Sequence, residues 1–531
     1  MKSDNSRTLL RALQDPLLYP HPVTRFDLRE THISWVLLTG PFAYKIKKPV
    51  NFGFVDFSSP AQRRFFCHEE IRLNRRSAPD IYVDVLPISG TPDHPRLDGQ
   101  GEPFEFAVKM RQFTADATLD HVLSQIRPEQ VDQLARDIAA FHHDVAEADR
   151  DGSFGTPGLI ARVITEVFEQ IPSHSPFVEH RPSLESLRHW LIQFHTAHAG
   201  EFEQRKAKGF VRECHGDLHL ANLVLLDDRI IAFDGIEFSE RLRWIDVIND
   251  VAFTVMDFQA RGHPALARRF LNRYLEFTGD YEGLELLPFY EVYRALVRVK
   301  VAGLTSAQAR RQDLEDSSHV DDVGQYLSAA QSLTESAAPW LVIMHGVSGT
   351  GKSTVAETLL EQTGAIRLRS DVERKRLYGL SPLDQSSGIL KPAMYGKEAT
   401  RKTYDRLQAL ARQLLRFGYP VIADATFLKR QHRDAFKTLA ASLNVPFLIL
   451  NMQATPATLR QRVTARAVAS DNVSEVDLSV LEQQERVQEP LGPDERATAV
   501  MLHAGASFDP AQVVGMLDEK HKGVKSPRCQ G

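Results

Sequence analysis

The sequence has little cysteine, which limits the kinds of site that it can build. Only Cys67, Cys214 and Cys529 occur among 531 residues, and they form no CxxC pair. Structural zinc sites and disulfide frameworks both need closely grouped cysteines. We therefore expect neither feature, and the spacing is typical of a protein from a reducing compartment.

Signals for export, membranes and nucleic acid are also missing. The opening residues MKSDNSRTLL contain no apolar signal-peptide core, and no apolar run approaches the roughly 18 residues that span a bilayer. Lysine and arginine number 64 and aspartate and glutamate 69, so the formal net charge of -5 shows no global basic excess. The sequence therefore predicts a cytoplasmic protein without a membrane partner, and it indicates no oligomeric state.

The length predicts more than one domain, because 531 residues exceed what a single hydrophobic core usually serves. The first hundred residues have strand patterns with one helix, whereas residues 116–210 and 239–335 have helical patterns. After the polar run SLTESAAP, strands and helices alternate as in a parallel α/β unit. We predict that the first domain covers residues 1–335 and the second domain residues 336–520. Residues 521–531 would form a frayed basic tail.

The stretch CHGDLHLANLVLLDDRIIAFDG, residues 214–235, places polar residues around two short apolar runs. His215-Gly-Asp217 and Asn222 offer a candidate base and a candidate magnesium ligand on one loop. LVLL and IIAF form a predicted hairpin that returns Asp234 to the same end as a second magnesium ligand. Phosphoryl transfer needs a carboxylate beside the acceptor hydroxyl and Mg²⁺ on the ATP phosphates. The stretch therefore predicts a phosphotransferase site, with a purely structural loop as the alternative.

These residues resemble the aminoglycoside phosphotransferase family, which is related to the eukaryotic-like protein kinases. The family pattern of His-Gly-Asp with Asn five positions later is matched by His215, Gly216, Asp217 and Asn222, and its metal-binding Asp by Asp234. The resemblance implies Asp217 as catalytic base and the other two side chains, Asn222 and Asp234, as magnesium ligands. It does not imply that the acceptor is an antibiotic, because acceptor specificity lies in loops and pockets.

The same resemblance, over about residues 25–335, implies an α+β bilobal protein-kinase-like domain. Its small lobe would cover about residues 1–112 and its large lobe about 113–335. The run ISWVLLTGPFAYKIKK reads as a hairpin within the small lobe. The loop near LRETH, which should cover the phosphates, contains no glycine.

A kinase of this type needs a strand lysine on the phosphates and a glutamate that pairs with it. Lys45 is the first candidate and Lys47 the alternate, while Glu69 and Glu70 are both candidates for the partner. The resemblance places the hinge that contacts adenine through backbone groups in VKMRQF, about residues 108–113, near Met110. Asp246 and Asp250 lie four residues apart, and we expect them to support the catalytic loop.

A second motif, GVSGTGKST, follows an apolar strand and opens a predicted helix. This is the context of a Walker A loop, whose backbone N–H groups hold phosphates. Lys352 would neutralise the β- and γ-phosphates and Ser353 would bind Mg²⁺. The predicted nucleotide-binding residues are Gly346, Val347, Ser348, Gly349, Thr350, Gly351, Lys352, Ser353 and Thr354.

The residues after this loop resemble the small P-loop kinases, including gluconate-kinase-like enzymes and polynucleotide 5′-hydroxyl kinases. The resemblance covers about residues 338–500 and implies an α/β P-loop NTPase domain with a parallel sheet. It implies Asp371 as catalytic base, although a helix-capping role is the alternative. It further implies that Arg374 binds the acceptor side and that Arg462 and Arg466 form a lid pair that clamps the phosphoryl group. Asp424 would be the carboxylate that holds the metal or positions the acceptor. The segment ASDNVSEVD is a predicted polar lid loop.

The sequence therefore predicts two fused kinases, each using ATP and Mg²⁺ to phosphorylate a hydroxyl of a small molecule. Nucleic-acid 5′ ends are a less favoured acceptor of the second domain, because only RLRSDVERKRLYG offers a nearby basic, aromatic segment. The residues also leave open a regulatory pseudokinase in the first domain and an acceptor-free ATPase in the second.

Overall fold

The computed structural model describes the residues in the ranges 3–51, 55–171, 177, 179–311, 318–335, 338–385, 393–467, 478–505 and 508–523. The chain forms two compact units. The first combines Met1–Arg261 with Phe289–Ala330, and the second combines Gly262–Pro288 with Gln331–Gly531. The contacts thus assign residues 262–288 to the second unit, whereas the sequence-based boundary placed them in the first domain.

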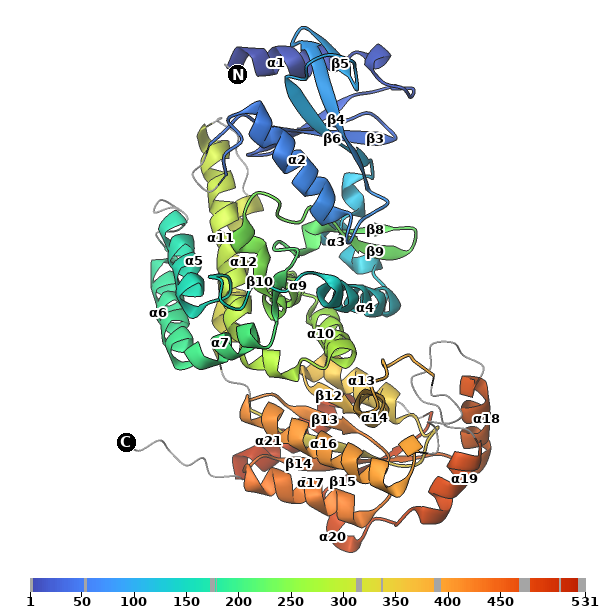
Figure 1. Cartoon of the computed structure of the whole chain (residues 1–531). Coiled ribbons are helices and arrows are strands. Elements are labelled where there is room, and N and C mark those ends of the chain that lie inside the picture. The colour runs from blue at the N-terminus through green and yellow to red at the C-terminus, as the bar shows by residue number, and fades with distance from the viewer. Residues whose placement is uncertain are drawn as a thin grey trace. The chain divides into compact units, whose positions relative to one another are not determined.

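The first unit begins with an antiparallel sheet crossed by helix α2 (Pro60–Asn74) (Figure 1). Ser59 caps this helix through a capping box and Pro60 occupies its first turn, as the sequence predicts. Within the described residues the sheet has six strands in the order β1-β2-β3-β6-β4-β5. Their bounds are β1 (Asp27–Glu30), β2 (Ser34–Leu38), β3 (Phe42–Lys47), β4 (Tyr82–Thr91), β5 (His94–Leu97) and β6 (Glu105–Arg111).

The predicted hairpin at ISWVLLTGPFAYKIKK is confirmed as the antiparallel pair β2 and β3. Successive residues of a strand point to opposite faces of the sheet. Tyr44 and Ile46 therefore join an apolar cluster with Leu9 and Leu10, while the residues between them face the other way. The prediction of a single helix in this region is wrong. A further helix, α1 (Ser3–Ala12), buries Leu9 and Leu10 in that cluster.

Helices dominate the remainder of the first unit. The stretch after the His215-Gly-Asp217 motif forms a β-hairpin, as predicted, and its turn residues Asp227 and Asp228 both have positive φ. A second short pair joins β7 to β10. The elements are α3 (Leu119–Val122), α4 (Pro128–Asp144), α5 (Pro157–Gln170), α6 (Arg181–Ala197), α7 (Ala199–Ala207), β7 (Val211–Glu213), β8 (Leu223–Leu226), β9 (Arg229–Ala232), α8 (Glu240–Arg243), β10 (Trp244–Asp246), α9 (Val247–Ala260), α11 (Leu287–Arg311) and α12 (Ser318–Leu333).

The second unit contains a parallel sheet with the order β12-β13-β11-β14-β15 among the described residues. Helices α13 and α21 pack on one face, and α16 and α17 lie on the other (Figure 1). The edge strand β15 was not predicted. The elements are β11 (Leu341–His345), α13 (Lys352–Thr363), β12 (Ile366–Arg369), α14 (Ser370–Leu377), α16 (Lys397–Arg416), β13 (Val421–Asp424), α17 (Arg430–Ser442), β14 (Phe447–Gln453), α18 (Pro456–Ala467), α19 (Leu478–Val487), α20 (Pro493–Arg496), β15 (Ala499–His503) and α21 (Pro510–Gly523).

Helix α10 (Pro264–Thr278) is part of this second unit because it packs on α13 and β12. Its Glu276 side chain is buried and contacts Arg367 at 2.7 Å and Arg369 at 3.1 Å. Burial would raise the pKa of Glu276, but the arginines around it hold that pKa well below its usual range.

No helix in the described part of the chain is both long and apolar enough to cross a membrane. The first three residues of the predicted basic tail continue α21, and the remainder of the tail lies outside the described residues.

Candidate active sites

The two strand lysines both reach the same helix carboxylate. Lys45 Nζ lies 2.9 Å from Glu70 Oε1, and Lys47 Nζ lies 2.7 Å from Glu70 Oε2. Glu69 instead pairs with Arg72 at 2.8 Å. Lys45 also donates to Asp234 Oδ1 at 2.6 Å, so it joins the sheet, α2 and the segment after β9. Of the two lysines, Lys45 contacts both the helix glutamate and the predicted metal ligand.

Lys47 has a different environment. Its side chain is fully buried and pairs with Glu237 as well as with Glu70. Burial would raise the pKa of Glu70, but the two lysines outweigh it and lower the pKa to about 2. The pKa of Glu237 is raised, because burial and the neighbouring Glu70 outweigh the attraction of the lysines.

Asp217 follows β7 on a loop, and its side chain is one-third exposed at 33%. Asn222 Nδ2 donates to Asp217 Oδ2 at 3.0 Å, and His219 Nε2 lies 3.4 Å from the same oxygen. Burial would raise the pKa of Asp217, but His219, Arg298 and Arg294 hold it well below its usual range. Asp217 is therefore a carboxylate at neutral pH.

Asp250 holds the backbone of this loop in place. Its carboxylate accepts hydrogen bonds from the backbone nitrogens of His215 at 2.8 Å and Gly216 at 2.9 Å. Asp246, in contrast, binds the guanidinium of Arg205 at 2.6 and 2.8 Å. It supports the start of α9 by accepting from Ile248 N, so of the two aspartates Asp250 alone bonds the motif directly.

The donor set at this loop fits Mg²⁺, which prefers oxygen ligands from carboxylates and amides. The side-chain amide nitrogen of Asn222 donates to Asp217, so the carbonyl oxygen of the same Asn222 side chain points away from that bond. The Asp234 side chain is 43% exposed, and the backbone of Asp234 has a positive φ of 59°. Met110, the predicted hinge residue, lies one position before the end of β6 and opposite Ala43 and Tyr82.

The glycine-rich motif of the second unit forms a loop between β11 and α13, as the sequence predicts. Gly346, Gly349 and Gly351 have φ values of 137°, 87° and 96°. A Cβ atom on Gly346 would lie 2.6 Å from the Met452 carbonyl oxygen, so only glycine fits there. Lys352 Nζ donates to the Val347 carbonyl oxygen at 2.8 Å, which folds the lysine across the loop.

The predicted carboxylates lie at the ends of neighbouring strands. Asp424 ends β13, next to β11, and is opposite Arg369 in the sheet. Its Oδ2 atom is buried without a hydrogen-bond partner, which fits a cation such as Mg²⁺. Asp371 is the second residue of α14, and the helix has no side-chain cap, so the capping alternative is not observed. Arg374 is buried and donates to the Met394 carbonyl oxygen at 2.7 Å.

Two helices contact the glycine loop. Arg462 of α18 donates from Nη1 to the Gly349 carbonyl oxygen at 3.3 Å. Gln484 of α19 accepts from the backbone nitrogen of Ser348 at 2.8 Å. Arg466 also belongs to α18, but its side chain lies outside the described residues, as does the predicted lid loop ASDNVSEVD.

Comparisons with known proteins match both domains of the chain. A model described as the phosphotransferase enzyme family matches residues 68–287, and a model described as an AAA domain matches residues 341–491. The uncharacterized protein Rv2004c of Mycobacterium tuberculosis (strain H37Rv) is 30% identical over 495 residues, which are 91% of this chain and 96% of that protein. The chain belongs to the family of this mycobacterial protein. It is a phosphotransferase enzyme with a phosphotransferase-family domain and a P-loop kinase domain.

Solved structures are similar to each domain. A gluconokinase from Sinorhizobium meliloti 1021 is 18% identical, and the match covers 35% of this chain and 95% of that chain with a TM-score of 0.25. A choline/ethanolamine kinase family protein from Mesorhizobium loti is 10% identical, and the match covers 63% and 95% with a TM-score of 0.37. The predicted fold class, a kinase-like α+β domain followed by an α/β P-loop domain, is confirmed.

Several residues around the two sites were missed from the sequence. In the phosphotransferase domain these are Glu237, His219 and Arg294, and in the P-loop kinase domain they are Glu276 and Gln484. The first two lie within or just after the recognised stretch, where a glutamate close to Asp234 and a second histidine are visible in the sequence. The others come from helices far along the chain, and no local pattern marks them.

Proposed function

We propose that this phosphotransferase depends on ATP and Mg²⁺ and that each of its two domains phosphorylates a hydroxyl group of a small molecule. The observation that carries the proposal is Lys45, which contacts Glu70 and Asp234 at once. A lysine fixed by a helix glutamate beside a metal-binding carboxylate is the arrangement that positions ATP phosphates in protein kinases.

In the phosphotransferase domain, Lys45 neutralises the α- and β-phosphates while Glu70 fixes its position. Asp217 accepts the hydrogen bond of the acceptor hydroxyl, and its depressed pKa keeps it ready to do so. Asn222 and Asp234 hold Mg²⁺, which neutralises charge on the phosphates when it is bound. The backbone near Met110 contacts the adenine.

In the P-loop kinase domain, the backbone of residues 346–354 holds the phosphates and Lys352 neutralises them. Ser353 and Asp424 hold Mg²⁺, consistent with the buried, unpartnered oxygen of Asp424. Asp371 acts as the base for the acceptor. Arg374 binds the acceptor side. Arg462 and Arg466 bind the phosphoryl group that is transferred.

The test compares the intact protein with Asp217→Asn and Asp371→Asn. Each is incubated with ATP, Mg²⁺ and a panel of sugars, amino alcohols, hydroxy acids, aminoglycosides and 5′-hydroxyl oligonucleotides. Phosphorylated products are identified by mass spectrometry. We expect each variant to lose a different product, because each carboxylate serves one domain.

Different outcomes would select a different function. A phosphorylated oligonucleotide that disappears in Asp371→Asn would assign nucleic-acid ends to the P-loop kinase domain. Products unaffected by Asp217→Asn would make the first domain a nucleotide-binding regulator. ATP hydrolysis that ignores every acceptor and is abolished by Lys352→Ala would make the second domain an ATPase.

A further inference from the structure

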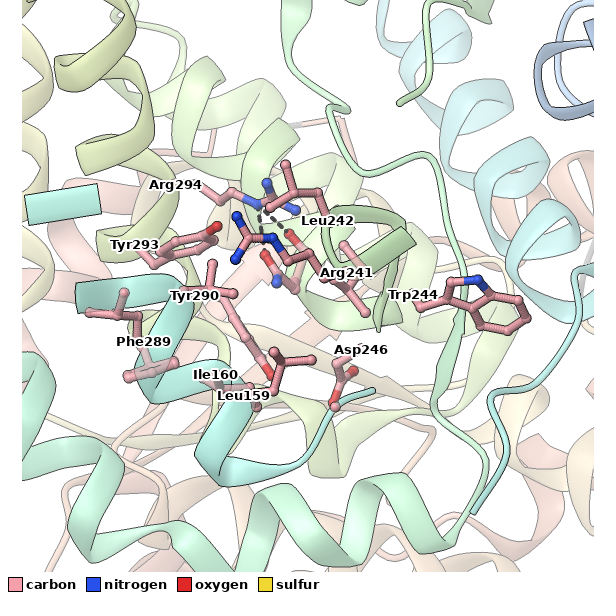
Figure 2. Close-up of a pocket in the computed structure, with 15 residues that line it drawn as sticks. Leu159, Ile160, Arg241, Leu242, Trp244, Asp246, Phe289, Tyr290, Tyr293 and Arg294 are labelled. Atoms are coloured by element: carbon pink, nitrogen blue, oxygen red, sulfur yellow. Dashed lines mark hydrogen bonds between the residues drawn. The ribbon is translucent and has the colours of Figure 1, made fainter. Parts of the chain in front are cut away.

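The phosphotransferase domain contains a pocket between α5, the segment from α8 to β10, and α11 (Figure 2). The space between its lining residues, which is partly open to solvent, amounts to about 500 Å³. Its wall is largely apolar and aromatic, with side chains from Leu159, Ile160, Phe289, Tyr290 and Tyr293. Such a wall suits the apolar body of a small molecule.

The pocket lies beside the catalytic loop. Arg294 lines it and donates from Nη1 to the Gly216 carbonyl oxygen at 3.0 Å, next to Asp217. The charge of Arg294 also contributes to the low pKa of Asp217, and the charge of Asp217 contributes to the raised pKa of Tyr293, which is due first to burial. Arg294 thus links the wall of the pocket to the loop that carries Asp217.

Arg294 supplies a charge that the protein does not neutralise by a direct ion pair. Its side chain is 3% exposed and donates only to Asn249 and to the Gly216 carbonyl oxygen. Its Nη2 atom is buried without a hydrogen-bond partner, and no carboxylate of the described residues forms an ion pair with it. A buried guanidinium nitrogen without an acceptor is costly, so it favours an anionic ligand.

The other charges of the pocket are already paired. Arg241 Nη1 lies 2.6 Å from Glu166 Oε1, and Asp246 binds Arg205. In Figure 2 the side chains of Arg241 and Arg294 point toward the same part of the pocket. The pocket therefore presents an excess of positive charge and repels a polycationic acceptor.

We propose that this pocket binds the acceptor of the phosphotransferase domain and that the acceptor is a hydroxy acid with an apolar or aromatic body. The carboxylate accepts hydrogen bonds from Arg294 Nη2, and the body packs between Tyr290 and Ile160. Because Arg294 also bonds Gly216, the carboxylate and the hydroxyl lie only a few atoms apart, as in a 2- or 3-hydroxy acid. This assignment rests on the proposed function.

The transfer that follows is balanced. The acceptor hydroxyl oxygen forms a bond to the γ-phosphorus of ATP while the bond from that phosphorus to the β,γ-bridging oxygen breaks. The hydroxyl proton passes to the Asp217 carboxylate, and ADP leaves. The product is a phosphorylated hydroxy acid.

The experiment uses the full chain and three matched probes that share a phenyl body. These are 3-phenyllactate, its uncharged amide 3-phenyllactamide, and the cationic amino alcohol phenylalaninol, with kanamycin as a polycation and 2-phosphoglycerate as a phosphate-bearing acid. Binding is measured by calorimetry, and transfer from ATP is measured as kcat/KM. We expect 3-phenyllactate to exceed its amide about tenfold or more, since a charge-assisted hydrogen bond distinguishes them.

Two variants locate the effect. Arg294→Gln should remove the preference for the acid over the amide, while Arg294→Lys should retain part of it. Ile160→Trp fills the pocket from the opposite wall, so it should weaken the acid and the amide equally. This second variant keeps the test decisive if Arg294→Gln does not fold, because Arg294 also supports the loop.

Several results would overturn the assignment. One is that the amide, phenylalaninol or kanamycin is used as well as or better than 3-phenyllactate. Another is that 2-phosphoglycerate is preferred over 3-phenyllactate. A third is that 3-phenyllactate fails to bind at millimolar concentration. If one of these other compounds is phosphorylated and Asp217→Asn abolishes the product, the acceptor class fails and the proposed function stands. If the acid binds through Arg294 but no phosphate is transferred, the proposed function fails and the ligand class stands.

Discussion

The carboxylate of Asp250 accepts a hydrogen bond of 2.9 Å from the backbone nitrogen of Gly216. The same side chain accepts from the preceding backbone nitrogen, that of His215, and His142 Nε2 lies 3.3 Å from the Asp250 carboxylate. Asparagine at this position would offer one oxygen in place of two, so one buried N–H group would lose its acceptor. We expect Asp250→Asn to lower stability by about 1–3 kcal/mol.

The measurement is thermal unfolding by calorimetry together with the kcat of the phosphotransferase domain. The kcat should fall even at a temperature where the variant is fully folded, because the loop that carries Asp217 is displaced. Loss of stability alone would leave kcat unchanged at that temperature. Asp144→Asn, at an exposed position at the end of α4, is the matched control and should change neither. Unchanged kcat in folded Asp250→Asn would contradict a positioning role.

Lys45 and Lys47 share Glu70, yet their removal should have different consequences. The side chain of Lys47 is 0% exposed and neutralises both Glu70 and Glu237. Lys47→Met therefore leaves buried carboxylates without that cation, and we expect a loss of about 3–5 kcal/mol. Lys45→Met leaves Glu70 paired with Lys47 and Asp234 partly in solvent, so the stability loss should be smaller.

The activity of the two variants separates the roles further. Lys45→Met should abolish phosphoryl transfer by the first domain while the protein stays folded. Urea unfolding ranks the stabilities, and product formation at low temperature ranks the activities. The opposite ranking, with a folded and inactive Lys47→Met and an active Lys45→Met, would assign the phosphate-binding role to Lys47.

The sequence predicted the parts of the two sites that are local in the chain. The hairpin with its turn at Asp227 and Asp228, the capped helix after Ser59 and the loop before Lys352 each depend on residues close together in sequence. Turn, cap and glycine signals act through short-range backbone geometry, so they can be read without the tertiary structure.

The parts that were missed depend on contacts between distant segments. Glu276 lies 91 residues before Arg367, and its burial against that arginine is visible only when α10 packs on β12. Arg294 meets Gly216 across 78 residues. The choice between Glu69 and Glu70 also needed the helix orientation, because adjacent helical residues point in directions about 100° apart.

Gln484 occupies a backbone donor of the glycine loop, whose N–H groups bind phosphate in the proposed function. Its side-chain oxygen accepts from Ser348 N at 2.8 Å, and Leu481 packs with Val347 on the same side of the loop. In the proposed function, ATP must displace this contact before it can use the same N–H group. We expect Gln484→Ala to tighten ATP binding to the P-loop kinase domain about two- to tenfold, as for loss of one competing hydrogen bond.

Calorimetric titration with a non-hydrolysable ATP analogue measures this effect. The binding heat that is lost in Lys352→Ala is the part that belongs to the second domain. Gln483→Ala, at the exposed neighbouring position, is the control. Weaker binding in Gln484→Ala would show instead that α19 holds the loop in its binding conformation.

Glu291 of α11 gives the phosphotransferase domain a specific dependence on pH. Burial raises the pKa of its carboxyl from 4.5 to about 8, although a hydrogen bond from Gln259 at 3.2 Å opposes the shift. Between these two values the folded protein retains a proton that the unfolded chain has lost. The folded state therefore binds more protons, and stability falls as pH rises through this interval.

Glutamine reproduces the neutral acid and can still accept from Gln259. We therefore expect Glu291→Gln to match the wild type near about pH 5 and to exceed it by a few kcal/mol near about pH 8. Unfolding midpoints measured across this range test the slope, with Glu203→Gln at an exposed position of α7 as control. A constant difference between variant and wild type at every pH would show that Glu291 keeps an ordinary pKa, and that its burial is balanced by a charge partner.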